Sequence, residues 1–153
     1  MGRYATDTAV SSERSRAEIE STLRRYGADH FGYMTGPDRA IIGFQANGRR
    51  VKFVVPMPDP NERQFTHTEA RAQKREQRAA HEAWEQACRQ RWRALALCIK
   101  AKLEAVACGI TTFESEFLAH IVLPNGETVA ERAIPAIAEA YDTNTMPPLL
   151  GHF

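Results

Sequence analysis

The chain has 153 residues, of which 43% are hydrophobic and 25% charged, and its net charge is +1. This composition is ordinary for a globular protein, and the length suffices for one domain with a core of its own. No apolar run approaches the ~20 residues needed to span a bilayer, and the chain does not start with the apolar segment of a signal peptide. We therefore expect a cytoplasmic protein without a membrane partner.

The three cysteines indicate neither disulfides nor a metal site. Cys88, Cys98 and Cys108 are ten residues apart, and this odd set fits neither a disulfide framework nor a zinc knuckle. We expect small, buried thiols in a reducing compartment, with no bound metal and no cofactor.

The beginning of the chain predicts an arm and a first helix. Residues 1–11 are small and polar, which is typical of a flexible arm ahead of a single domain over residues 12–153. Ser15 and Glu18 have the spacing of a capping box, in which two side chains satisfy free amide groups at a helix start. The predicted helix spans residues 16–26.

A three-stranded antiparallel meander is predicted next. Its strands span residues 30–34, 40–45 and 49–55, and Gly36-Pro37 breaks the chain between the first two. Asn47-Gly48 predicts a tight hairpin turn between the last two, because both residues tolerate positive φ. In the third strand apolar side chains alternate with basic ones, so one face is apolar and the other is basic.

One long, arginine-rich helix is predicted over residues 66–106. Apolar side chains recur along it at spacings of three and four residues, as one buried helix face requires. They are Trp84, Cys88, Trp92, Leu95, Ile99, Leu103 and Val106. A straight helix of this length would extend about 60 Å, more than the diameter expected for the domain. We therefore expect residues 95–106 in the core and residues 66–93 to project or to meet a partner.

The last third of the chain predicts a short helix, a small hairpin and a final helix. Thr111 and Glu114 form a second capping box, ahead of a helix over residues 113–120. Pro124-Asn125-Gly126 separates two short apolar segments, which is typical of a hairpin turn. The final helix, residues 131–141, has one apolar face composed of Ile134, Ile137, Ala138 and Tyr141.

These elements together predict an α+β fold. It comprises an N-terminal helix, a three-stranded antiparallel meander, one long central helix, a short helix, a small hairpin and a C-terminal helix. The tail over residues 142–153 carries apolar side chains that must dock on the core or meet a partner.

No motif in the sequence indicates an enzyme. Glu116 and His120 are four residues apart and could share a metal or a proton from one helix face, with Glu114 beside them. A third ligand at a recognisable spacing is missing, so an ordinary surface pair is the favoured interpretation. The motifs of serine hydrolases, zinc proteases, nucleotide-binding loops and dinucleotide-binding folds are absent.

Basic residues on the meander and on the long helix favour binding to DNA or RNA. Arginines make bidentate contacts to phosphates, and several together give steep salt dependence. For the helix, a solvated face with intrahelical ion pairs is an equal alternative. The candidate nucleic-acid or partner-binding residues are Arg39, Arg49, Arg50, Lys52, Arg71, Lys74, Arg75, Arg78, Trp84, Arg89 and Arg93.

The strand aromatics Phe31, Tyr33, Phe44 and Phe53 could stack on bases, but a place in the core is favoured for them.

A protein-interaction role is the alternative to nucleic-acid binding. Trp84 and Trp92 lie eight residues apart on one helix face, among arginines, and both residue types anchor interfaces. A core position is favoured for Trp92 and stays open for Trp84. An overlong helix that its own domain cannot cover also favours a homodimer through the long helix.

Two resemblances bear on function. The order helix–strand–strand–strand–helix over residues 15–80, with Gly36-Pro37 and Lys74-Arg75, resembles a double-stranded-RNA-binding domain. That family's Ser-Lys-Lys helix start is absent, the connection before the helix is long and rich in proline, and the second helix is too long. The likeness is therefore one of element order alone.

The second resemblance covers most of the chain. Residues 15–26, 84–95 and 109–114 resemble a family of small proteins encoded by bacteriophages and prophages. This resemblance implies a bacterial host cell and either an accessory of DNA metabolism or an inhibitor of host defences. We therefore expect a non-enzymatic phage-type protein that binds nucleic acid, with an interaction protein that inhibits a host defence complex as the alternative.

Overall fold

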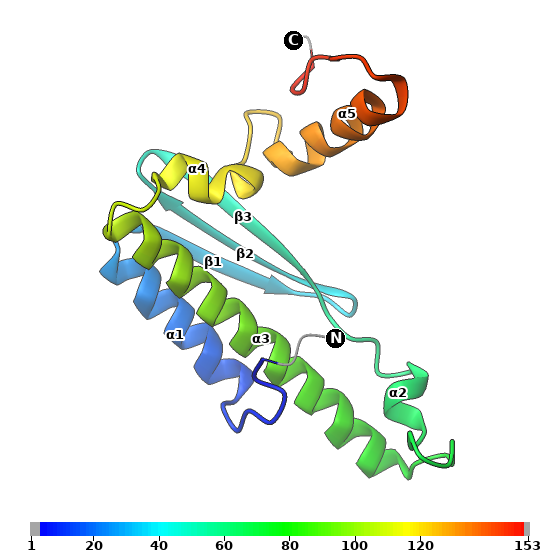
Figure 1. The fold of residues 1–153 in the computed structure, drawn as a ribbon. Coiled ribbons are helices and arrows are strands. Elements are labelled where there is room, and N and C mark those ends of the chain that lie inside the picture. The colour runs from blue at the N-terminus through cyan, green and yellow to red at the C-terminus, as the bar shows by residue number, and fades with distance from the viewer. Residues whose placement is uncertain (1–3, 152–153) are drawn as a thin grey trace.

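The computed structural model describes residues 4–151, and residues 1–3 and 152–153 lie outside this part of the chain. The described part has the α+β architecture and element order that the sequence predicts (Figure 1). Its elements are α1 (Ser12–Arg25), β1 (His30–Thr35), β2 (Arg39–Ala46), β3 (Arg49–Pro56), α2 (Arg63–Thr66), α3 (Gln77–Ala107), α4 (Phe113–Phe117), the 3-10 helix η1 (Leu118–His120) and α5 (Val129–Thr143).

The three strands form one antiparallel sheet in the order β1-β2-β3. Asn47 and Gly48 have φ values of 51° and 69° between β2 and β3, as a tight hairpin turn with two left-handed residues requires. The predicted meander and its hairpin are therefore confirmed. Across the sheet, Gly32 pairs with Gly43, and Gly43 pairs with Lys52.

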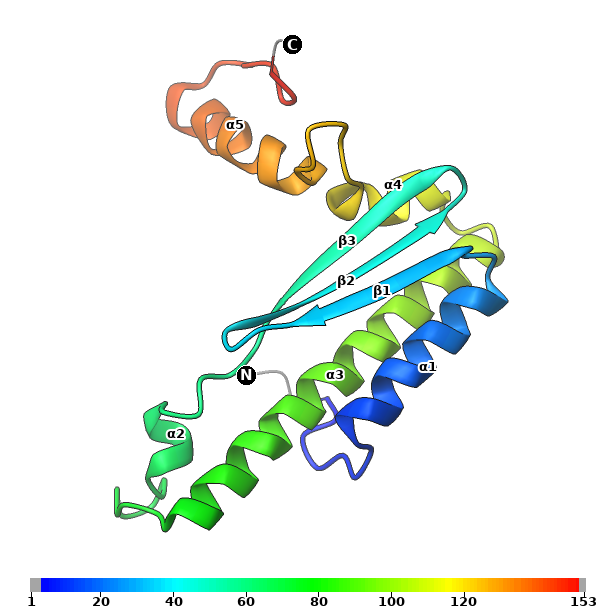
Figure 2. The same ribbon diagram turned by 180° about the vertical axis from the view of Figure 1, so that it is seen from behind.

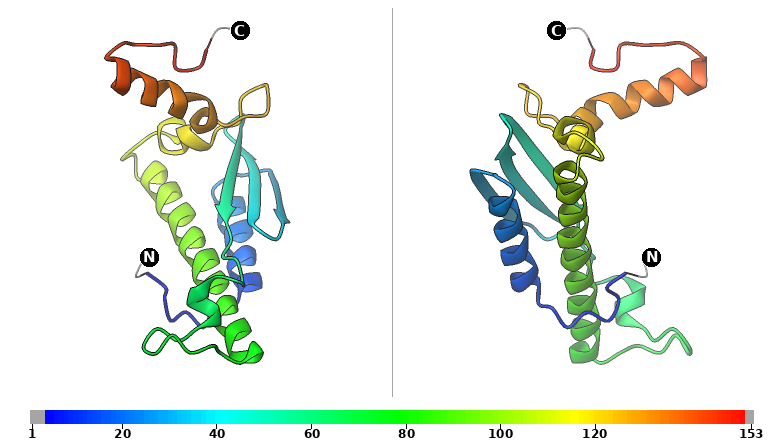
Figure 3. Two further views of the ribbon diagram at one scale, coloured as in Figure 1. Left: turned by 90° about the vertical axis from the view of Figure 1, so that its right-hand side faces the viewer. Right: turned by 60° about the vertical axis from the view of Figure 1, so that its left-hand side comes forward.

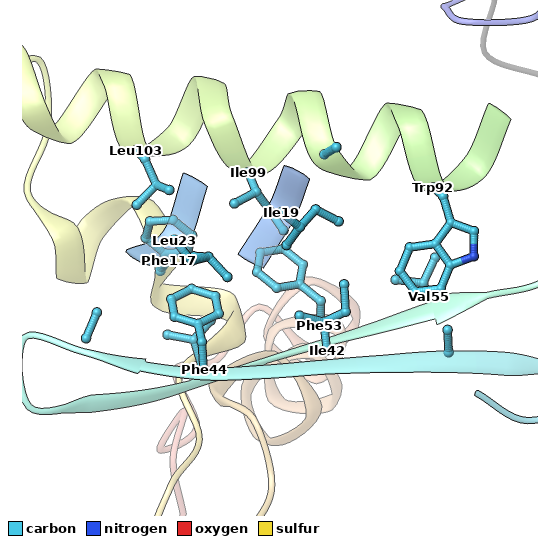
Figure 4. Close-up of a cluster of buried hydrophobic side chains, with 14 of the residues drawn as sticks. Ile19, Leu23, Ile42, Phe44, Phe53, Val55, Trp92, Ile99, Leu103 and Phe117 are labelled. Atoms are coloured by element: carbon cyan, nitrogen blue, oxygen red, sulfur yellow. The ribbon is translucent and has the colours of Figure 1, made fainter. Parts of the chain in front are cut away.

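The core lies between the sheet and the helices α1 and α3, which run side by side (Figures 1 and 2). Every second residue of β2 and β3 is buried, because successive strand side chains point to opposite faces. Figure 4 shows side chains packed between α3 and the strands. They include Ile19, Leu23, Ile42, Phe44, Phe53, Val55, Trp92, Ile99, Leu103 and Phe117.

The predicted capping box at the start of α1 is wrong. The helix begins at Ser12, and the hydroxyl of Ser11 caps it by accepting a hydrogen bond from the Arg14 amide at 3.1 Å. Ser15 is fully buried one turn inside the helix, and Glu18 binds Arg93 of α3. Several serines near a helix start all suit the cap, so tertiary packing decides between them.

The N-terminal arm lies along α3 where it is described. The side-chain amide of Gln86 donates to the carbonyls of Thr6 and Thr8 at 3.0 Å, and that of Gln90 donates to the Tyr4 carbonyl at 3.1 Å. The flexibility of residues 1–11, and a single domain over residues 12–153, stay predictions.

The long helix is shorter than predicted. α3 has 31 residues and extends about 46 Å, and residues 67–76 ahead of it form an irregular loop. In this loop Ala72 is left-handed, at φ 48°, and the Thr68 hydroxyl accepts a hydrogen bond from the Gln73 amide at 3.2 Å. Such side-chain bonds compete with a helix, and helix propensity alone does not stabilise a segment without a packed apolar face.

Gly109 caps the C-terminal end of the long helix. Gly109 has φ 73° and donates its amide to the Val106 carbonyl at 3.1 Å. The amide of Ile110 reaches back to the Ala105 carbonyl at 3.0 Å. These two bonds satisfy carbonyls that the last helical turn leaves free.

The short helix and the second hairpin follow the predicted order with different details. Thr112, not Thr111, caps α4 through the Ser115 amide, and Leu118 after it is exposed. Between the two arms of the predicted hairpin, the structure has one isolated bridge, Val122 with Thr128.

The final helix extends away from the sheet and from α3 (Figures 1 and 3). Thr128 and Glu131 cap it reciprocally, a capping box that the sequence analysis missed. Its predicted apolar face is exposed, with Tyr141 at 86% and Ile134 at 62%. The tail turns back along α5, where Arg132 Nε donates to the Leu150 carbonyl at 3.1 Å. The part of the predicted tail after residue 151 lies outside the described residues.

Candidate nucleic-acid interface

Two groups of the predicted basic residues lie at opposite ends of α3. Arg49 and Arg50 stand at the β2–β3 turn, beside the C-terminal end of α3 (Figure 1). Arg71, Lys74 and Arg75 belong to the loop before α3, not to a helix as predicted. Because α3 is about 46 Å long, the two groups do not form one continuous surface.

Acidic residues near the basic residues of this loop reduce its net positive charge. Arg78, at the start of α3, binds Glu82 one turn later at 3.1 Å. Glu69 and Glu76 alternate with the basic residues of the loop in sequence. A hollow of about 480 Å³ lies between this loop and the first turns of α3, and Lys74, Arg75 and His81 contribute to its wall.

The remaining predicted residues on α3 have partners within the chain. Arg93 forms an ion pair with Glu18 and so joins α3 to α1. Arg89 donates to the Gln86 side chain at 2.9 and 2.6 Å. Trp84 is half-buried, and its indole N–H donates to the Pro58 carbonyl at 2.7 Å. These contacts assign all three side chains a structural role.

The groove beside Trp84 has a volume of about 390 Å³ and contains charges of both signs. The guanidinium of Arg16 lies over the rings of Tyr33, at 5.2 Å, and Trp92, at 5.0 Å, and its side chain also approaches Glu13. Burial raises the pKa of the Cys88 thiol in the same groove, which keeps the thiol protonated near neutral pH. The groove therefore favours neither the binding of an anion nor a reaction by the Cys88 thiolate.

The sheet face that points away from α1 and α3 is the better candidate, and we call it the open face. Strand alternation places Arg39, Arg50 and Lys52 on it. The three strands contain no aspartate or glutamate. Phe44 and Phe53 point to the opposite side and are buried in the core, as the sequence analysis favoured.

A shallow trough crosses the open face. Its volume is about 500 Å³, and the paired glycines Gly32 and Gly43 form its floor. A Cβ at Gly32 would meet no atom within 4 Å, and one at Gly43 would meet only the Val51 carbonyl, at 3.8 Å. No side chain therefore stands above the middle of the sheet. The surrounding wall includes His30, Ile41, Gln45, Arg50, Lys52 and Val122.

The basic residues of the three strands differ in whether an acidic side chain already binds them. Arg39 donates to the Asp38 carboxylate at 2.7 and 3.0 Å, which raises the pKa of Arg39 and lowers that of Asp38. Lys52 Nζ lies 3.4 Å from the carboxylate of Glu131. Within residues 4–151, neither Arg49 nor Arg50 forms an ion pair with an acidic side chain. Arg50, which lines the trough, can therefore receive an anionic ligand without breaking an existing ion pair.

The acid–histidine pair of the sequence analysis does not form. Glu116 binds Lys102 at 2.9 Å, and His120 stacks on the Phe53 ring with centroids 4.0 Å apart. Burial, followed by the positive charge of Lys102, lowers the pKa of His120. Among residues 4–151, no three His, Cys, Asp or Glu side chains come together as a metal site would need.

Comparisons with known proteins add no further constraint. No family model matches the chain, and neither a curated protein nor a solved structure matches it. The bacteriophage family and the bacterial host therefore stay predictions from the sequence. No helix in the described part is both long and apolar enough to cross a membrane.

Proposed function

We propose that the protein binds single-stranded nucleic acid along the open face, without catalysing a reaction, as an accessory of phage DNA metabolism. One observation carries this proposal: a sheet face without acidic strand residues combines basic side chains with a floor of two glycines. Basic grooves that follow the backbone are the common feature of proteins that bind single strands.

The chemistry of the trough suits a single strand better than a rigid duplex. Arg50 supplies a guanidinium group for a phosphate, since it is not paired to an acid in the described chain, and Lys52 supplies a second positive charge beside it. Gly32 and Gly43 let a base or sugar approach the backbone closely. The planar side chains of His30 and Arg50 border the trough and can stack on unpaired bases.

The alternative, inhibition of a host defence complex, has less support. It relied on Trp84 and Trp92, among arginines on one helix face, as anchors of an interface. Trp84 is half-buried, its N–H is bound to the Pro58 carbonyl, and its ring lies beside His81 at 5.4 Å. We therefore prefer nucleic-acid binding.

The test compares two double variants with the same loss of charge. Binding to labelled single-stranded DNA and RNA and to duplex DNA is measured by fluorescence anisotropy at several salt concentrations. Arg50→Ala with Lys52→Ala, which removes the two basic side chains that line the trough, should weaken single-strand binding at least about tenfold. It should also reduce the slope of log K against log salt by about 1.4, or roughly 0.7 for each phosphate contact.

The matched control is Arg71→Ala with Lys74→Ala, which removes two exposed charges from the opposite end of the molecule. It should leave the affinity and the slope nearly unchanged. Equal losses in the two double variants, or no binding of the unchanged protein at low salt, would overturn the proposal.

A further inference from the structure

α5 exposes an apolar stripe. Ile134, Ile137 and Tyr141 are 62%, 42% and 86% exposed, and the spacings of three and four residues place them on one face. The tail packs along another side of the helix, beside Arg132 and Glu139. Within α5 only Ala133 is buried. A helix with this pattern normally lies against another apolar surface.

The open face offers a surface of matching shape and chemistry. Met34, Ile41 and Val54 form one cross-strand row on it, and Met34 and Val54 are exposed. The next row consists of Gly32, Gly43 and Lys52, so a helix can approach the sheet there closely. The sheet therefore has a helical layer on one side and room for a second helix on the other.

The charges of the two surfaces are complementary. α5 contains three carboxylates, Glu131, Glu139 and Asp142, and one arginine. The open face carries three basic strand residues, Arg39, Arg50 and Lys52, and no acidic strand residue. Asp142 lies eleven residues after Glu131, about three helical turns, so both acids lie along one edge of the apolar stripe.

The α5 that covers the open face must come from another copy of the chain. Two contacts hold the start of α5, and the segment that leads into it, beside β3. The Val122 amide donates to the Arg50 carbonyl at 2.8 Å, and the Glu131 carboxylate lies 3.4 Å from Lys52 Nζ. The reciprocal cap of Thr128 and Glu131 fixes the first turn as well. Folding α5 over its own sheet would break these contacts, whereas insertion into a neighbour retains them.

Pairing of α5 with α5 is less favourable. In an antiparallel pair of helices, like edges of the two stripes meet, so the acidic edges that carry Glu131 and Asp142 would face each other. The basic open face avoids this repulsion.

We propose that two copies of the chain exchange α5, so that the stripe of Ile134, Ile137 and Tyr141 in each copy covers the open face of the other. The exchange is two-fold symmetric and leaves neither surface uncovered in either copy. Its effect on ligands rests on the proposed function: the dimer closes the face that binds nucleic acid, so dimerisation and binding compete.

The oligomeric state in the absence of nucleic acid tests this inference. Sedimentation equilibrium over roughly a hundredfold range of protein concentration should show a monomer–dimer equilibrium. Tyr141→Asp on the helix and Met34→Asp on the open face should each raise the dimer dissociation constant at least about tenfold. Both side chains are mostly exposed in the single chain, so these variants should still fold.

Ile110→Asp is the matched control, because it introduces the same charge at an apolar side chain that is 80% exposed elsewhere. It should dimerise like the unchanged protein. Arg50→Glu and Asp142→Arg should each weaken the dimer, and the two together should restore it. A monomer at every concentration, or a dimer lost in Tyr141→Asp but retained in Met34→Asp, would overturn the exchange.

The two proposals fail in different ways. A monomer that binds single strands would overturn the α5 exchange and leave the proposed function standing. A dimer with the expected variant pattern, whose Tyr141→Asp form still binds no nucleic acid, would support the exchange and overturn the proposed function.

Discussion

The hydroxyl of Ser15 is buried, and among the buried side-chain polar atoms of residues 4–151 it alone has no hydrogen-bond partner. A capping role would make Ser15→Ala costly by about 1 kcal/mol. Because the hydroxyl makes no bond, we expect Ser15→Ala to leave the free energy of unfolding unchanged or to raise it by up to about 1 kcal/mol. Ser11→Ala, which removes the true cap, should lower it by about 1 kcal/mol. Urea denaturation of both variants decides between the two serines.

His120 makes the stability depend on pH in a defined direction. Burial lowers its pKa in the folded protein below the ordinary 6.5, so the unfolded chain takes up the proton first as the pH falls. The contribution of His120 to the free energy of unfolding is complete at pH values above the ordinary pKa of 6.5. This contribution is lost as the pH falls below that pKa. We expect the urea midpoint to fall between about pH 7 and about pH 5.

The matched variant for this prediction is His120→Phe, which cannot titrate and can still stack on Phe53. It should show a smaller fall of the midpoint over the same pH range. An identical fall in both proteins would show that other groups are responsible.

At the scale of elements, packing partners decide where α3 begins. The connection that leads from β3 towards α3 is tied to the helix by two bonds. Trp84 donates to the Pro58 carbonyl at 2.7 Å, and Arg91 donates to the Pro56 carbonyl at 2.5 Å. Phe65 of α2 is buried as well. The connection between β3 and α2 is thus held against α3 by contacts of its own.

Trp84→Phe should loosen this connection. The variant keeps an aromatic ring and loses the N–H, which leaves the Pro58 carbonyl without its donor at a cost of about 1 kcal/mol. Limited trypsin digestion after Arg63, Arg71 and Lys74 should become roughly fivefold faster, because cleavage requires local opening. Cleavage after Arg24 in α1 is the internal control and should keep its rate.

At the scale of the whole molecule, alanine substitutions in the core and in the α5 stripe should have different effects on the free energy of unfolding. Phe117 is fully buried and makes edge contacts with Phe44, at 5.8 Å, and with Phe53, at 6.3 Å. Phe117→Ala should cost about 3–5 kcal/mol of unfolding free energy. Tyr141→Ala should change the stability of the monomer by no more than about 0.5 kcal/mol. Thermal unfolding of both variants at low protein concentration provides the comparison.

The sequence by itself determined the features that depend on a few neighbouring residues. Asn47-Gly48 turns the chain and Gly109 ends α3, because a left-handed backbone is a local property. The alternation in β3 and the three-to-four spacing around Ile99 and Leu103 were enough to predict a strand and a helix with buried faces.

Only the tertiary structure decided the features that depend on distant residues. Ser11 rather than Ser15 caps α1, and the loop over residues 67–76 replaces a helix, because nothing there offers an apolar face for packing. The chain path also separates the predicted basic residues and joins Arg93 to Glu18. The sequence also predicted that α5 has one apolar face. That this face is exposed to solvent follows only from where η1 and the sheet lie. Local preference sets what a segment can form, and the surfaces that other segments provide decide what it contacts.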